Sequence, residues 1–159
     1  KINGLSNVTD ALSSIARTHS LFISRGDDSG THKTELRLWQ LAAVDVNAES
    51  GSWYRDAGSG MGATLNIAAA IDAYSLSDRA TWIALRNKAN LVVFVEEDAR
   101  LFNQYGVIAV NPERHPHIKS DDAQRFVSWL TSTTGQAAIN AFTIDGQQLF
   151  FANYSGGSS

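Results

Sequence analysis

The stretch Ser24–His32, which reads SRGDDSGTH, is the part of the chain that most strongly constrains its fold. It follows a short apolar run, Leu21–Ile23, and precedes a segment, residues 36–42, whose apolar residues recur at helical spacing. This order predicts a strand over residues 21–24, a glycine-rich turn, and a helix from Thr31 to about Val44. The free backbone N–H groups and the positive dipole end of such a helix point at one spot, where an anion binds favourably.

The side chains of this stretch supply further donors for an anion. Arg25 carries a planar fork of N–H groups, and Ser29 and Thr31 carry hydroxyls. Gly30 allows the main chain to approach a ligand closely. The predicted anion-binding residues of this stretch are therefore Arg25, Ser29, Gly30 and Thr31, with Ser24 and His32 as secondary candidates.

Two other readings of the same residues stay open on local sequence alone, and a third is rejected. Ser29 or Thr31 fits a simple helix cap equally well. Residues 25–27 spell the Arg-Gly-Asp adhesion tripeptide, which would suit an interaction module. Ser29 and His32 lack the strained turn and the partner acid of a catalytic triad, so no catalytic residue is assigned.

A second glycine-rich junction, residues 58–64, leads into another helical pattern. Its spacing formally fits a dinucleotide-binding fingerprint, with Asp78 about twenty residues further on. We discount that reading because no long apolar strand precedes the glycines. A second helix N-terminus facing the first anion loop fits better, and it adds Gly62, Ala63 and Thr64 to the predicted anion-binding residues.

Both junctions belong to a set of motifs spread over nearly the whole chain. In order, these are Ser24–His32, Trp53–Arg55, Gly60–Leu65, Leu76–Arg79, Phe102–Pro112 and Leu149–Phe151. The set resembles the tungstate-binding proteins of ATP-binding-cassette (ABC) importers. The resemblance implies an α/β, type II periplasmic-binding-protein-like fold, with one complete α/β lobe plus the C-terminal part of the other. It also implies that Arg25 and Thr31 contact a tetrahedral oxyanion, and that Ser77, a predicted helix cap, borders the cleft.

The predicted organisation has four parts. Residues 1–20 form an N-terminal linker and a helix, Asn7–His19, capped by Ser6 or Asn7. Residues 20–97 form the ligand-binding lobe, with further strands at Tyr74–Ser77 and Leu91–Val95. Residues 98–154 return to the other lobe through a strand at Tyr105–Val110, and residues 155–159 form a flexible tail. Two late helices are expected, capped by Asp121 or Asp122 and by Thr133 or Thr134, with a turn at Asp145-Gly146.

Composition excludes several classes of function. The net charge is −3, which gives no indication of nucleic-acid binding. The chain has no cysteine, so disulfides and thiolate metal sites are absent. His115 and His117 alone are weak evidence for a metal, and we expect neither metal nor cofactor.

No apolar run approaches the length of a membrane span. No signal peptide and no Thr/Ser-rich anion loop precede Lys1, so we expect the chain to begin inside a longer protein.

The expected function is that of a periplasmic or otherwise extracytoplasmic solute-binding protein, not an enzyme. It would capture tungstate, or alternatively molybdate, and deliver it to the membrane permease of an ABC importer. Two alternatives remain from the residues themselves. One is a phosphate- or sulfate-binding protein, because sequence does not measure cavity size. The other is an enzyme acting on phosphate esters, for which Asp27 and Asp28 are the only acids in the loop.

Overall fold

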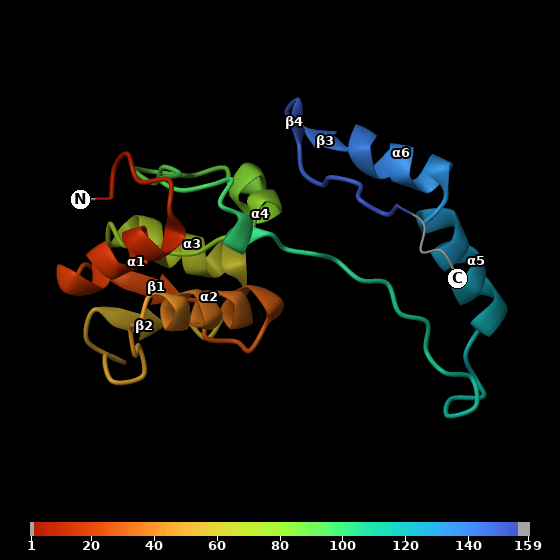
Figure 1. The fold of residues 1–159 in the computed structure, drawn as a ribbon, viewed down its shortest axis with the longest axis horizontal. Coiled ribbons are helices and arrows are strands. Elements are labelled where there is room, and N and C mark those ends of the chain that lie inside the picture. The colour runs from red at the N-terminus through yellow and green to blue at the C-terminus, as the bar shows by residue number, and fades with distance from the viewer. Residues whose placement is uncertain (1, 156–159) are drawn as a thin grey trace. The chain divides into compact units, whose positions relative to one another are not determined.

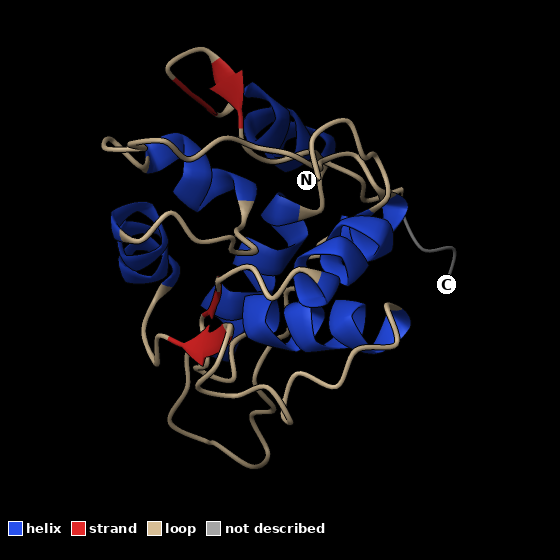
Figure 2. Cartoon of the chain, turned by 90° about the vertical axis from the view of Figure 1, so that its left-hand side faces the viewer, coloured by secondary structure: helices blue, strands red, loops and turns tan. Residues whose placement is uncertain are grey.

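The computed structural model describes residues 2–155, which divide into two compact units between Asn103 and Gln104 (Figure 1). The first unit holds all the residues of the predicted site. Its elements in chain order are α1 (Val8–Arg17), β1 (Phe22–Ser24), α2 (Gly30–Leu41), β2 (Tyr54–Asp56), α3 (Met61–Ala70), α4 (Arg79–Ala84) and the 3-10 helix η1 (Ala99–Leu101). Helices and loops make up most of the chain and the strands are short (Figure 2). The predicted assignment of segments to two lobes stays a prediction.

Strand β1 is the centre of the first unit. It pairs in parallel with β2, with Phe22 opposite Tyr54 and Ser24 opposite Asp56. On its other side the Ile23 N–H donates to the Tyr74 carbonyl at 2.8 Å. Residues on both sides of β1 therefore run parallel to it, and the carboxyl ends of all three segments lie at one edge.

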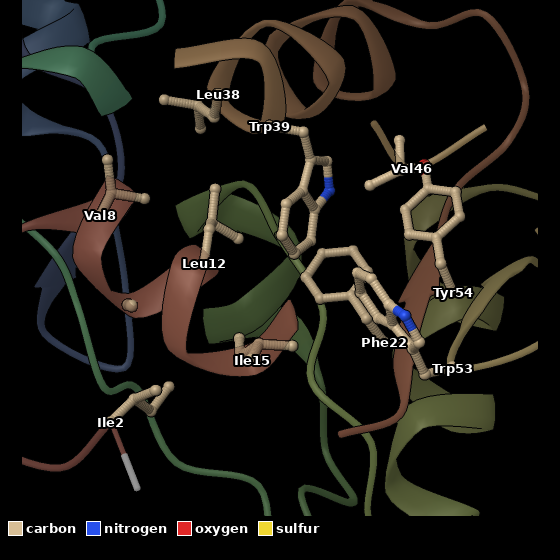
Figure 3. Packing of buried hydrophobic residues seen from close by; sticks show 11 residues of the cluster. Ile2, Val8, Leu12, Ile15, Phe22, Leu38, Trp39, Val46, Trp53 and Tyr54 are labelled. Atoms are coloured by element: carbon tan, nitrogen blue, oxygen red, sulfur yellow. The ribbon is translucent and has the colours of Figure 1, made fainter. Parts of the chain in front are cut away.

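Side chains alternate across β1, and each face has its own helices. Phe22 faces a cluster that includes Leu12 of α1 and Trp39 of α2, as Figure 3 shows. Ile23 faces a second cluster with Ala68 of α3. Helices α1 and α2 thus cover one face of the strands and α3 covers the other, which is the layering of an α/β fold.

Aromatic rings fill the larger cluster. Trp39 is fully buried and meets Phe22, Trp53 and Tyr54 edge-on, with ring centroids 5.1 to 6.1 Å apart. Figure 3 shows Trp39 pointing from its helix into the group formed by the other three rings. Such edge-to-face contacts stabilise a core beyond simple burial. They fix α2 against β1 and β2, and so fix the place where α2 begins.

The second unit contains two helices and a short hairpin. These are α5 (Ser120–Leu130), α6 (Thr133–Ala141), and the antiparallel pair β3 (Thr143–Ile144) and β4 (Gln147–Gln148). The predicted turn at Asp145-Gly146 is confirmed: both residues have positive φ, 50° and 74°, as a two-residue hairpin turn requires.

Three predicted strands are wrong. Tyr74–Ser77 forms a single bridge, from Tyr74 to Phe22. Leu91–Val95 and Tyr105–Val110 form no strand, and their exposed side chains include Val92 (60%) and Ile108 (90%). An apolar, β-branched run becomes a strand only when a neighbouring strand accepts its hydrogen bonds. Neither run has such a neighbour among residues 2–155.

Helix starts are predicted well, but several capping residues differ. Asn7 caps α1 as predicted, accepting from the Thr9 and Asp10 N–H groups. Asp78, rather than Ser77, caps α4. Lys119 holds the N-cap position of α5, in place of Asp121 or Asp122, without a side-chain hydrogen bond. Ser132 caps α6 in place of Thr133 or Thr134. The caps of α5 and α6 lie one to three residues earlier than predicted, because each helix continues back to the first residue with helical backbone angles, whereas the cap of α4 lies one residue later.

The predicted tail falls mostly on residues 156–159, which lie outside the described part of the chain. Among the helices of residues 2–155, none combines the length and the apolar character needed to cross a bilayer.

Candidate anion-binding site

The two predicted anion loops lie together at the carboxyl edge of β1 and β2. The first, residues 25–29, joins β1 to α2, and the second, residues 57–60, joins β2 to α3. Because the two strands are parallel neighbours, both following helices begin at this edge. This is where ligands bind in open α/β sheets.

Contacts between backbones hold the two loops against each other. The Ala57 N–H donates to the Ser24 carbonyl at 2.9 Å, and the Ser59 N–H donates to the Arg25 carbonyl at 3.2 Å. A Cβ placed on Gly26 would lie 2.6 Å from the Asp56 Cβ, and the φ of Gly26 is +60°. Only glycine fits this point, for both reasons.

The Arg25 side chain is held by an acid of its own loop. Its Nε and Nη2 both donate to Asp27 Oδ2, at 3.1 and 2.5 Å. The guanidinium has five N–H donors, so this pair engages two of them. The Nη1 donors make no hydrogen bond within residues 2–155. Asp27 thus orients Arg25 and leaves one side of its fork for a ligand.

Hydrogen bonds also keep Asp27 charged. The Ser29 hydroxyl is the main cause, followed by Arg25 and the Ser29 backbone N–H, and together they lower the pKa of Asp27 to about 2. At neutral pH Asp27 is therefore ionised and offsets the positive charge of the Arg25 guanidinium.

The start of α2 uses several predicted donors within the protein. Ser29 is the helix cap: its hydroxyl oxygen accepts from the His32 N–H at 3.3 Å. The His32 Nδ1 in turn accepts from the Asp28 N–H at 3.0 Å. His32 is thereby folded back onto the loop. Gly30 and Thr31 begin the helix itself and lie at its positive end.

The start of α3 has no side-chain cap. Gly60 holds the N-cap position, and Gly62 and Ala63 lie in the first turn. The Ser59 hydroxyl oxygen just before them is buried and has no hydrogen-bond partner within residues 2–155. A buried hydroxyl of this kind calls for a partner from outside the protein chain.

Two predicted residues, Thr64 and Ser24, have buried side chains that are hydrogen-bonded within the protein. Thr64 is fully buried, and its hydroxyl donates to the Gly60 carbonyl at 3.2 Å inside its own helix. Ser24 is also fully buried, and its oxygen accepts from the Gly26 N–H at 3.3 Å. Both shape the loops from beneath.

Ser77 lies at a third junction on the same edge, following the segment that bridges to β1. Its hydroxyl donates to the Asp78 carbonyl at 3.0 Å. The Asp78 carboxylate accepts from both the N–H and the hydroxyl of Thr81, at 2.8 and 2.7 Å. The hydroxyl of Ser77 therefore serves the local turn in this structure.

Sequence reasoning missed one charged residue of this region, Glu35. It is 2% exposed and accepts hydrogen bonds from Tyr54 and Trp39. The available signal was its position: three and four residues before Leu38 and Trp39, it falls on the apolar face of α2. Among residues 2–155 there is no group of three or more His, Asp or Glu side chains placed to hold a metal ion.

Comparison with known proteins agrees with this geometry. A family model described as a PBP superfamily domain, the abbreviation standing for periplasmic binding protein, matches residues 2–134. The tungstate-binding protein TupA of Peptoclostridium acidaminophilum is 42% identical over 136 residues, covering 86% of this chain and 46% of that protein. TupA of Campylobacter jejuni is 37% identical over 149 residues, covering 91% of this chain and 54% of that protein.

A solved structure gives the same result. The tungstate-binding protein TupA of Desulfovibrio alaskensis is 39% identical, with a TM-score of 0.79 over 96% of this chain and 62% of that one. The chain thus spans about half the length of the curated relatives it matches. The predicted fold class and the predicted resemblance are both confirmed, and the chain belongs to the periplasmic-binding-protein superfamily.

Proposed function

We propose that this chain is the oxyanion-binding part of an extracytoplasmic solute-binding protein that captures tungstate for an ABC importer. Molybdate is the alternative anion. The observation that carries the proposal is that two helix N-termini, Arg25 and the unpartnered hydroxyl of Ser59 belong to two loops that lie together at one edge of the strands. The names of the relatives supply the identity of the anion.

Recognition in this proposal involves no bond making or breaking. A tetrahedral dianion accepts hydrogen bonds from backbone N–H groups and from Arg25, each charge-assisted bond contributing roughly 1.5–3 kcal/mol. Nanomolar binding needs about −12 kcal/mol in total, so several donors act together. No cofactor is required, and the membrane permease would recognise the loaded, closed form.

Isothermal titration of the chain with tungstate tests this proposal, with sulfate as the control anion. We expect saturable heat with tungstate and much weaker heat with sulfate. Arg25→Ala should weaken tungstate binding roughly 10- to 100-fold, which corresponds to one lost charge-assisted bond. Arg17→Ala is the matched control, because Arg17 is an exposed arginine of α1 in the same unit. Absence of tungstate binding, or equal affinity in both arginine variants, would contradict the proposal.

The two alternatives give different results in the same assay. A phosphate- or sulfate-binding protein would prefer its own anion over tungstate. An enzyme acting on phosphate esters would need a free general base, and Asp27, whose pKa lies far below neutrality, is held by Arg25 and Ser29. Release of product from a chromogenic phosphate ester would favour the enzyme.

A further inference from the structure

The Glu35 carboxyl lies in the core of the first unit, where an apolar side chain would be expected. Its Oε1 accepts from the Tyr54 hydroxyl at 2.8 Å and from the Trp39 indole N–H at 3.2 Å. Removing an acid from water is unfavourable unless hydrogen bonds replace the lost hydration. Two neutral donors on one oxygen satisfy that oxygen and leave Oε2 as the atom that can carry a proton.

Glu35 lies in α2 one turn after the residues that begin this helix at the candidate anion site. It follows Thr31 by four residues, so both lie on the same face of α2, one turn apart. Its bond to Tyr54 joins α2 to β2, and Ser24, the last residue of β1, lies close enough to lower the pKa of its carboxyl. The next residue after Ser24 is Arg25. Glu35 therefore links the anion-binding helix α2 to β2, the strand that leads into the second anion loop and pairs with the strand before Arg25.

Charge at this position opposes an anion above it. Burial is the main influence and raises the pKa of Glu35, while the hydrogen bonds from Tyr54, Ser24 and Trp39 act in the opposite direction. A dianion bound nearby disfavours the ionised carboxylate further, because like charges repel strongly in a poorly solvated interior.

We propose that Glu35 is a positioning residue of the oxyanion site, and that it takes up a proton from solvent as the oxyanion binds. The inference rests on the proposed function, since it needs an oxyanion at this edge. Protonation of Oε2 removes the opposing charge while Oε1 keeps its two donors, so the link between α2 and β2 is retained in the loaded state.

The pH dependence caused by other titratable groups near Glu35 has to be distinguished from that caused by Glu35 itself. His32 lies on the same helix and its charge lowers the pKa of Glu35. Tyr54 comes from β2, and burial followed by the charges of Glu35 and Asp56 raises its pKa, so it stays neutral. His32 is thus the competing source of pH dependence. It too would favour binding at low pH, because its protonated form attracts an anion.

The test measures tungstate affinity between about pH 5 and pH 8 and counts the protons taken up, by titrating in buffers of different ionisation enthalpy. Glu35→Gln mimics the protonated acid. Glu49→Gln is the matched control, since Glu49 also accepts from an indole N–H, that of Trp53, at 3.0 Å. His32→Gln removes the competing group. Thermal unfolding of each variant checks that it is folded.

In the unaltered chain we expect affinity to fall as pH rises, by at most about tenfold per pH unit, the limit for one linked proton. Glu49→Gln and His32→Gln should keep this slope and the proton uptake. Glu35→Gln should bind as well as the unaltered chain at low pH, with a flat profile and no proton uptake from this position. A Glu35→Gln variant with the original slope would overturn the inference while leaving the proposed function intact. Absence of tungstate binding by the unaltered chain would overturn both.

Discussion

Arg25 and Asp27 form an ion pair within one loop, with Arg25 Nε 3.1 Å from Asp27 Oδ2. The pair sits where β1 ends and α2 is about to begin. Its consequence is that the arginine is oriented before any ligand arrives, so little side-chain entropy is lost on binding.

The acid dependence of this pair is the first prediction. Because the folded-state pKa of Asp27 is about 2, below its ordinary value of 3.8, its contribution to stability is present above about pH 4 and is lost as pH falls toward 2. Asp27→Asn should lower the free energy of unfolding at neutral pH, change it little near pH 2, and so flatten its pH dependence in that window. Denaturant titrations at several pH values measure this. Asp28→Asn, at a far more exposed acid, is the control and should leave the profile unchanged.

Gly26 carries the second prediction. Gly26→Ala should destabilise the first unit by roughly 1–3 kcal/mol, because the new Cβ meets Asp56 and the backbone has positive φ. Gly58→Ala separates the two causes: Gly58 has a similar φ, +57°, with nothing within 4 Å of the added carbon. It should cost only the backbone part, about 1 kcal/mol. Equal losses of stability in the two variants would show that contact with Asp56 is unimportant.

The two threonines of the predicted site should differ in binding. Thr64→Val should leave tungstate affinity within about twofold, because its hydroxyl already donates to the Gly60 carbonyl. Thr31→Val should weaken binding roughly tenfold, the effect of losing one hydrogen bond to a charged group. Titration of both variants decides the matter. A larger loss in Thr64→Val would mean that its hydroxyl turns toward the ligand on binding.

Asp98 carries the last prediction, on stability. Its Oδ2 accepts from the Val8 N–H at 2.8 Å, and Arg100 both pairs with it and donates to the Thr9 hydroxyl at 2.9 Å. The hydrogen bond from Arg100 is the main cause that lowers the pKa of Asp98. The contribution of Asp98 to stability is therefore present at neutral pH and lost in acid. Asp98→Ala should lower the free energy of unfolding by about 1 kcal/mol or more, because the first backbone N–H of α1, that of Val8, would lose its acceptor. Glu97→Ala, at the adjacent acid, should have no comparable effect, and thermal unfolding compares the two.

Features that depend on neighbouring residues were determined by the sequence alone. The strand–loop–helix order around Ser24–His32, the cap of α1 at Asn7 and the turn at Asp145-Gly146 all follow from local hydrogen bonding and backbone preference. The resemblance to tungstate-binding proteins also came from ordered motifs. The predictions of local structure were confirmed because each needs only a few adjacent residues.

Tertiary structure decided what depends on partners far away in the chain. Leu91–Val95 and Tyr105–Val110 have strand-like composition but form no strand, since a strand needs a second backbone to complete its hydrogen bonds. Packing buried Glu35 against Tyr54, nineteen residues away, and turned Thr64 inward. The sequence by itself therefore determined which residue types could meet an anion. Only the pairing of β1 with β2 and the packing of α2 and α3 on their two faces decided which of them point toward one edge, because those contacts form between segments that the sequence keeps apart.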